Sequence, residues 1–178
     1  MNIKWDQIKQ YTINIGALSK PSEICSIFKE RNIDWYIYEI VQVGYQDSPT
    51  FTIKFGMSAD NSVSHGERAY RQIAHCTSWG DLCIRGSSGA DFFVIQHMVK
   101  EKYGINLNHK TMQLRVWDLT NYEFDTIDYW QEINKMEAHF IDRYTKFYGH
   151  KPIGNINDEK NAMFRPAIRR ETYNSLFG

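Results

Sequence analysis

One acidic side chain stands among apolar neighbours in the longest predicted helix, residues 128–148. With about 100° between successive residues, this helix carries one apolar stripe, and Glu137 lies in the middle of it. The members of the stripe are Ile133, Met136, Phe140, Ile141, Tyr144, Phe147 and Tyr148. Because burying a carboxylate is costly, Glu137 is either satisfied by an arginine or a backbone amide, or held at a cleft to bind a divalent cation or act as acid or base. The helix alone leaves both interpretations open.

A second predicted helix, residues 66–76, concentrates basic groups. Arg68, Arg71, Gln72 and His75 project within about 80° of one another. Such a face is either solvated surface or an anion site, because a guanidinium matches two phosphate oxygens at once.

Two predicted strands, residues 35–41 and 50–55, bring further candidates together. Tyr36 and Tyr38 are two residues apart and therefore point to the same side of the first strand. Strict alternation in the second strand places Lys54 on the side of Thr52, opposite Ile53. One face of the hairpin is thus expected to carry two phenols and an ammonium, although tyrosines in strands are most often packing residues.

The order of these motifs carries a family resemblance. In chain order the segments are Tyr36-Ile37-Tyr38, Lys54-Phe55-Gly56-Met57-Ser58, Arg71-Gln72-Ile73-Ala74-His75, Glu137 and Lys151-Pro152-Ile153-Gly154-Asn155. This order resembles the GIY-YIG nuclease superfamily, and most of all its small type II restriction endonucleases. In that subgroup a lysine replaces the second motif tyrosine, and a KPIG stretch follows the metal-binding glutamate. The segment Asp91–Gln96 also resembles that subgroup.

The resemblance implies a catalytic role for five residues. Tyr38 is similar to the tyrosine that orients or deprotonates the attacking water, and Lys54 would contact that water or that phenol. Arg71 would bind the scissile phosphate, and His75 matches a helix position that is often His or Tyr. Glu137 resembles the sole carboxylate ligand of a divalent metal, here Mg²⁺, one ion per active site, for which Mn²⁺ can substitute.

Two of these assignments have competitors, and further residues are candidates for DNA contact. Tyr36 is the alternative to Tyr38, and Arg68 is the alternative to Arg71, which we prefer because the Arg-x-x-x-His spacing fits the family. The expected DNA-binding residues are Tyr36, Arg68, Arg85, Asn155, Arg165, Arg169 and Arg170. Asn155 matches an asparagine that some members place beside the glutamate.

Composition restricts the class of protein. The 178 residues are 42% hydrophobic and 24% charged, which is typical of one folded domain. Three cysteines without a CxxC pair predict neither a disulfide framework nor structural zinc. The net charge is zero, but residues 143–178 hold seven bases and three acids, so a basic face is available. Without a signal or membrane segment, we expect a soluble, cytoplasmic protein.

The predicted elements indicate an α+β fold, a small three-stranded, largely antiparallel sheet flanked by helices, as the GIY-YIG resemblance implies. We expect three regions. Residues 1–34 form an N-terminal helical arm, residues 35–157 the nuclease core with inserted recognition loops, and residues 158–178 a basic C-terminal tail.

The resemblance implies a site-specific double-strand DNA endonuclease, a type II restriction enzyme. It would hydrolyse phosphodiester bonds to 5′-phosphate and 3′-hydroxyl ends, as a homodimer on a short palindromic site. One alternative is another nuclease role within the superfamily, in a phage, a mobile element or repair. The other is a non-catalytic nucleic-acid-binding module on the same fold.

Overall fold

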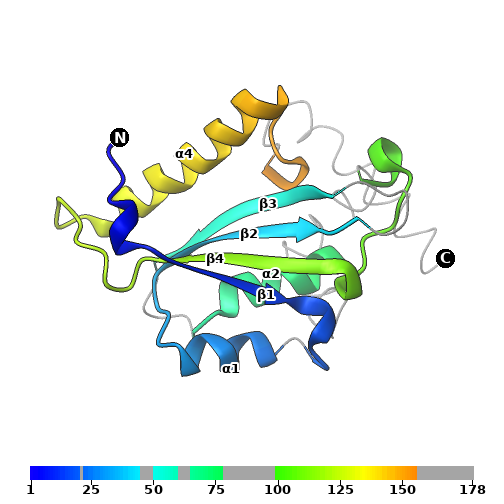
Figure 1. Ribbon diagram of the computed structural model, residues 1–178, viewed down its shortest axis with the longest axis horizontal. Coiled ribbons are helices and arrows are strands. Elements are labelled where there is room, and N and C mark those ends of the chain that lie inside the picture. The colour runs from blue at the N-terminus through cyan, green and yellow to red at the C-terminus, as the bar shows by residue number, and fades with distance from the viewer. Residues whose placement is uncertain (21, 45–49, 60–64, 78–98, 156–178) are drawn as a thin grey trace.

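The chain forms an α+β structure around one four-stranded antiparallel sheet, in the strand order β1-β4-β2-β3 (Figure 1). The computed structural model describes residues 1–20, 22–44, 50–59, 65–77 and 99–155. The strands are β1 (Lys9–Asn14), β2 (Tyr36–Gln42), β3 (Phe51–Ser58) and β4 (Met112–Asp118), and the described α-helices are α1 (Glu23–Glu30), α2 (Glu67–Thr77) and α4 (Tyr129–Tyr148). Short 3₁₀ turns are η1 (Trp5–Gln7), η2 (Ile15–Ala17), η4 (His109–Thr111) and η5 (Ile153–Asn155).

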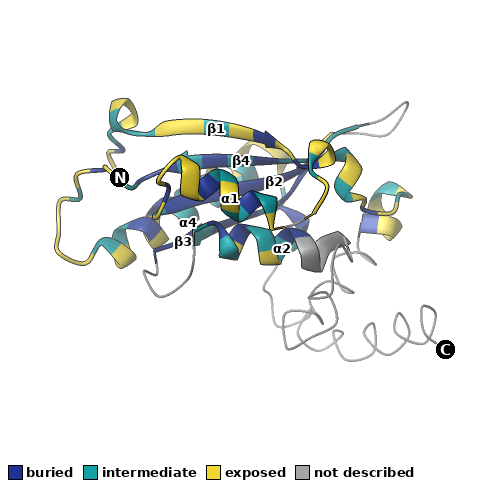
Figure 2. Ribbon diagram, turned by 90° about the horizontal axis from the view of Figure 1, so that it is seen from below, coloured by how far each residue is buried: buried dark blue, intermediate teal, exposed yellow. Residues whose placement is uncertain are grey.

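The helices cover the two faces of the sheet unequally. On one face, α1 and α2 bury Phe28 and Ile73 against a core that includes Tyr36 and Ile40 (Figure 2). On the other face, α4 contributes side chains to the buried cluster that contains Ile37 of β2. The alternation of β2 side chains between the two clusters is the two-residue period of a strand buried on both faces.

The predicted helical arm of residues 1–34 is helical only in part, since it contains a strand before α1, and the predicted count of three strands is wrong. Residues Lys9–Asn14 form β1, which pairs with β4 from Lys9↔Asp118 to Asn14↔Gln113. Only Ile13 of this edge strand is buried. With its other side chains exposed or half-exposed, β1 lacks the alternation that reveals a strand, and pairing with a distant segment determines its conformation.

The predicted hairpin of β2 and β3 is confirmed, but its register contains an irregularity that changes the position of Lys54. Pairing passes from Ile40↔Lys54 directly to Val41↔Thr52, so that Ile53 is an extra residue on β3. Such a bulge shifts side chains relative to strict alternation. Lys54 therefore points toward α2, on the side of Ile53, and the predicted placement beside Thr52 is wrong.

The free edge of β3 is partly closed by η5. The Asn155 side chain accepts a hydrogen bond from the Phe55 amide at 2.7 Å and donates one to the Phe55 carbonyl at 2.9 Å. These two bonds imitate those of a neighbouring strand, which covers backbone groups that would otherwise be exposed at a sheet edge. A Cβ at Gly154 would lie 2.8 Å from the Ile53 carbonyl oxygen, so this close approach requires glycine.

The longest predicted helix is confirmed as α4. Asp128 caps its start by accepting a hydrogen bond from the Gln131 amide at 3.0 Å, and Gly149 ends it in the left-handed conformation with φ of 78°. Its apolar stripe is covered only in part, because Ile133 is buried whereas Phe147 remains 81% exposed. In the part of the chain that the structure describes, no helix combines the length and apolar character that a membrane span requires.

Candidate active site

A cavity of about 290 Å³ opens where α2, the edge strand β3 and α4 meet, and we call it the edge cavity. Four separate elements contribute to it, since Tyr38 comes from β2, Lys54 from β3, Arg68 from α2 and Glu137 from α4. Its remaining lining residues are Gly56, Met57, Ser58, Ala59, Gln72, Trp130 and Asn134. Residues far apart in the sequence thus share one small, largely polar space.

Lys54 interacts with side chains of both helices that line the cavity. Its Nζ donates a hydrogen bond to Oε1 of Gln72 at 3.0 Å, which fixes the ammonium against α2. Its positive charge also acts on the carboxylate of Glu137, on the other helix. The bulge at Ile53 is the structural reason that a residue of the edge strand can face α2 at this point.

The two candidate tyrosines have different surroundings. Tyr38 lines the edge cavity and is 3% exposed, and a Cβ on Gly56 would overlap its phenol ring. Tyr36 lies deeper, with its ring 4.8 Å from that of Phe28 and its hydroxyl accepting from the Ala69 amide at 3.4 Å. Burial raises the pKa of Tyr36 well above its usual value. The geometry therefore favours Tyr38 as the phenol of the site, because Tyr38 and not Tyr36 lines the edge cavity, and the expected DNA contact of Tyr36 stays a prediction.

Glu137 is half-buried in the wall of the cavity. Burial raises the pKa of its carboxyl group, and the charge of Lys54 lowers it in part. Among the described residues, neither an arginine nor a backbone amide forms a hydrogen bond with this carboxylate. Of the two interpretations that its helix allows, the structure favours a carboxylate held at a cleft.

The two arginines of α2 do not share one environment. Arg68 lines the edge cavity, whereas Arg71 forms an ion pair with Glu67 one turn earlier and its side chain is 55% exposed. The preference for Arg71 on sequence spacing is therefore not supported by its position, and Arg68 becomes the stronger candidate for a phosphate ligand. His75 lies on α2, but its side chain is outside the described residues.

The remaining predicted DNA contacts are placed only in part. Asn155 is described, and its side-chain amide is used to hold the main chain of Phe55. The other four, Arg85, Arg165, Arg169 and Arg170, lie outside the described residues, as do the Asp91–Gln96 segment and the basic tail.

Three helical residues of the cavity were not among the predicted catalytic or binding residues. Trp130 and Asn134 precede Glu137 by seven and three residues on α4, and this spacing places them on the same helix face. That signal was available in the sequence. Gln72 was recognised only as part of a polar face, because its bond to Lys54 depends on the bulge in β3.

The donor chemistry of the edge cavity fits a single Mg²⁺ ion. Magnesium prefers oxygen ligands, keeps several waters and is often bound through one or two carboxylates together with substrate phosphates. Glu137 provides one such carboxylate. Among the described residues there is no group of three or more His, Cys, Asp or Glu side chains that could form a closed metal site. Substrate and water would have to supply the other ligands.

Comparison with known proteins provides no further evidence about this site. No family model, no curated protein and no solved structure matches the chain. The functional assignment accordingly depends on the residues of the edge cavity and on the order of their motifs.

Proposed function

We propose that this protein is a metal-dependent, site-specific double-strand DNA endonuclease of the type II restriction class, with the active-site chemistry of the GIY-YIG nucleases. One observation carries the proposal: a phenol, an ammonium, a guanidinium and a carboxylate from four elements line the same cavity. Hydrolysis of a phosphodiester needs a positioned water, a group to receive its proton, and positive charge where the transition state gains negative charge. The edge cavity contains a candidate for each task.

Tyr38 receives or directs the proton of the attacking water. A phenol has an ordinary pKa of about 10, so a phenolic base needs cations nearby that favour its ionised form. Lys54 and Arg68 place two such charges in the same cavity. Gly56 leaves the space that the Tyr38 ring occupies, so the phenol has a fixed position before substrate arrives.

Lys54 and Arg68 bind the non-bridging oxygens of the scissile phosphate. The hydrogen bond of Lys54 to Gln72 holds the ammonium in place while leaving two of its three protons for other partners. Arg68 offers the two-pronged contact that suits phosphate oxygens. Both groups would stabilise the additional negative charge of the transition state.

Glu137 holds the divalent cation, Mg²⁺ or in its place Mn²⁺. Glu137 would hold such a cation where its Lewis acidity would favour departure of the 3′ oxygen, and departure of that oxygen leaves 5′-phosphate and 3′-hydroxyl ends. The neighbouring charge of Lys54 favours the ionised carboxylate that metal binding requires. Because one cavity can cut one strand at a time, we further propose that two copies of the chain act as a homodimer on a short palindromic site.

The test is digestion of long duplex DNA with Mg²⁺, followed by sequencing of the fragment ends. The native protein and Asp142→Asn, an acid-to-amide change at an exposed site on α4, are expected to give fragments that end at one short motif. Glu137→Gln is expected to give none. DNA binding without cutting by the native protein across several metals and salt concentrations would contradict the enzyme and leave the non-catalytic binding module. Cutting at unrelated sequences would support a nuclease and contradict its assignment to the restriction class.

A further inference from the structure

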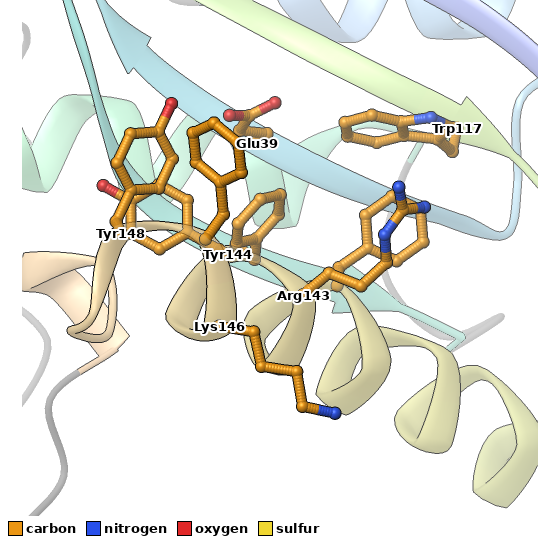
Figure 3. Close-up of a pocket in the computed structure, with 9 residues that line it drawn as sticks. Glu39, Trp117, Arg143, Tyr144, Lys146 and Tyr148 are labelled. Carbon is orange, nitrogen blue, oxygen red and sulfur yellow. The ribbon is translucent and has the colours of Figure 1, made fainter.

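A second cavity, of about 670 Å³, lies against the face of the sheet that α4 covers incompletely (Figure 3). Six aromatic rings form most of its wall, and we call it the aromatic groove. They are Phe55, Trp117, Phe140, Tyr144, Phe147 and Tyr148. The groove is lined by the second half of α4, whereas the edge cavity uses residues of the first half.

The rings at the mouth of the groove are unusually accessible. Phe147 is 81% and Tyr148 57% exposed, and their ring centroids lie 4.8 Å apart. Tyr148 also lies 4.4 Å from Tyr144, which continues the row of rings into the groove. Exposed aromatic side chains in a row are the surfaces on which unpaired nucleobases stack in proteins that bind single strands.

The floor of the groove carries a buried hydrogen-bond acceptor. Glu39 is 5% exposed, and its carboxylate accepts from the Thr52 hydroxyl at 2.5 Å and from the Arg115 guanidinium at 3.3 Å. A carboxylate has about four lone-pair positions, so these two bonds leave capacity for another donor. Carboxylates in DNA-binding proteins accept from the exocyclic amine of cytosine.

A positive charge completes the set of groups. The Arg143 side chain extends from α4 toward Trp117, whereas Lys146 points away from the groove (Figure 3). Lys146 is also paired with Asp142 at 2.7 Å. Arg143 is thus the cation placed to meet a phosphate attached to a base that lies against the rings.

We propose that the aromatic groove binds one nucleobase that has left the double helix, together with its adjoining phosphate. The proposal rests on the proposed function in taking DNA as the ligand. Tyr144 follows Glu137 by seven residues, a rise of about 10 Å along α4, which corresponds to roughly three nucleotides of one strand. A base held in the groove could therefore belong to the strand that passes the edge cavity.

The test measures binding of fluorescently labelled single-stranded oligonucleotides in EDTA, so that cleavage does not contribute. Phe147→Ala is expected to weaken binding by about five- to 150-fold, as the loss of one base-stacking ring does elsewhere. Ile127→Ala, at a 97% exposed apolar position that lines neither cavity, is the matched control and is expected to bind as the native protein does. Arg143→Ala is expected to bind more weakly than its control Lys135→Ala.

Two changes of ligand sharpen the result. An oligonucleotide of equal length that lacks its bases is expected to bind weakly, although its phosphate charge is the same. Among free mononucleotides, dCMP and dAMP should compete better than dTMP, which has no exocyclic amine for Glu39. Competition by free mononucleotides as effective as that of the oligonucleotide would overturn a base held within a strand and indicate a site for free nucleotides.

Other outcomes would also overturn the proposal. Equal affinity of native and Phe147→Ala protein for the oligonucleotide would show that no base binds in the groove. If Phe147→Ala instead converts a dimer to a monomer in light scattering while its affinity for the oligonucleotide stays native, a second copy covers the groove. Because the assay contains no metal, a native protein that binds bases here yet cuts no DNA would refute the proposed function alone.

Discussion

The edge cavity and the aromatic groove use the same helix and the same strand for opposite kinds of chemistry. In the edge cavity, α4 contributes Glu137 opposite the charged groups of Lys54 and Arg68. In the aromatic groove, the same helix contributes Phe140 and Tyr144 against Phe55. Charged groups of both signs therefore gather on one side of β3, and flat apolar surface gathers on the other.

The difference shows how a single irregularity in a strand can separate two functions. Lys54 and Phe55 are adjacent in β3 and point to opposite faces, and the extra residue Ile53 determines which face each one takes. Because of the bulge, Thr52 shares the face of Glu39, whereas Lys54 lies on the opposite face, toward α2. The ammonium therefore lines the edge cavity and not the aromatic groove.

Among the variants that sharpen this comparison, the largest expected effect distinguishes the two arginines of α2 and tests which side chain belongs to the edge cavity. Arg68→Ala should lower the single-turnover rate of DNA cleavage by about 10²- to 10³-fold, the usual cost of removing a group that stabilises transition-state charge. Arg71→Ala should lower it by less than about threefold, because Arg71 is paired with Glu67 and does not line the edge cavity. The reverse ranking would return the phosphate contact to Arg71 and contradict the cavity as we describe it.

A smaller effect concerns the closure of the β3 edge beside the cavity. Asn155→Ala removes both hydrogen bonds to Phe55 and should lower the free energy of unfolding by about 1–3 kcal/mol. Urea denaturation measures this change, with Asn121→Ala, an exposed asparagine, as the control expected to unfold as the native protein does. Unchanged stability of Asn155→Ala, combined with a large loss of DNA affinity, would instead support the DNA contact that the family resemblance implies.

The smallest expected effect is the pH dependence of stability that the titration of Glu137 causes. Burial raises the pKa of this carboxyl group, so the folded protein retains its proton at pH values where the unfolded chain has lost it. Native stability should therefore decrease as pH rises from the ordinary carboxyl range through the raised pKa. Glu137→Gln has no carboxyl group to titrate and should not lose stability in this way. In EDTA its melting temperature should exceed that of the native protein at pH 7 but not at pH 3.

Asp142→Asn, whose side chain is exposed, is the control for that measurement and should show no such pH-dependent gain. If the melting temperature of Glu137→Gln exceeds that of the native protein by the same amount at both pH values, amide packing, and not titration, stabilises the variant. The carboxylate would then not be under the burial penalty that distinguishes the edge cavity from the surface.

The sequence predicts the parts of the fold that carry a strong local period. The hairpin of β2 and β3 and the helix α4 were expected, because the spacing of apolar residues in each segment matches the period of a strand or of a helix. The strand β1 was not, since most of its side chains are exposed and its partner lies about 100 residues away. Pairing over such a distance leaves no signal in a local window.

The candidate site was predictable in its residue types but not in its geometry. Tyr38, Lys54 and Glu137 were expected together and do line one cavity. The preference for Arg71 over Arg68 stays a prediction that the position of Arg71 does not support, because both project from the same helix face and only the position of Glu67 and the cavity separates them. The apolar stripe of α4 likewise indicated core, and only the extent of the sheet shows that its last turns stay uncovered.

The most direct test of the central claim is the rate of duplex DNA cleavage as Mg²⁺ is titrated against native protein and Glu137→Gln. We expect cleavage by the native protein to rise from zero to a plateau with Mg²⁺, and the variant to be slower by at least about 10³-fold, since a lost Lewis acid costs several kcal/mol of transition-state stabilisation. DNA binding in EDTA should be equal for the two proteins. Native cleavage that is independent of metal, or a variant that cuts at the native rate, would show that the edge cavity is not the active site.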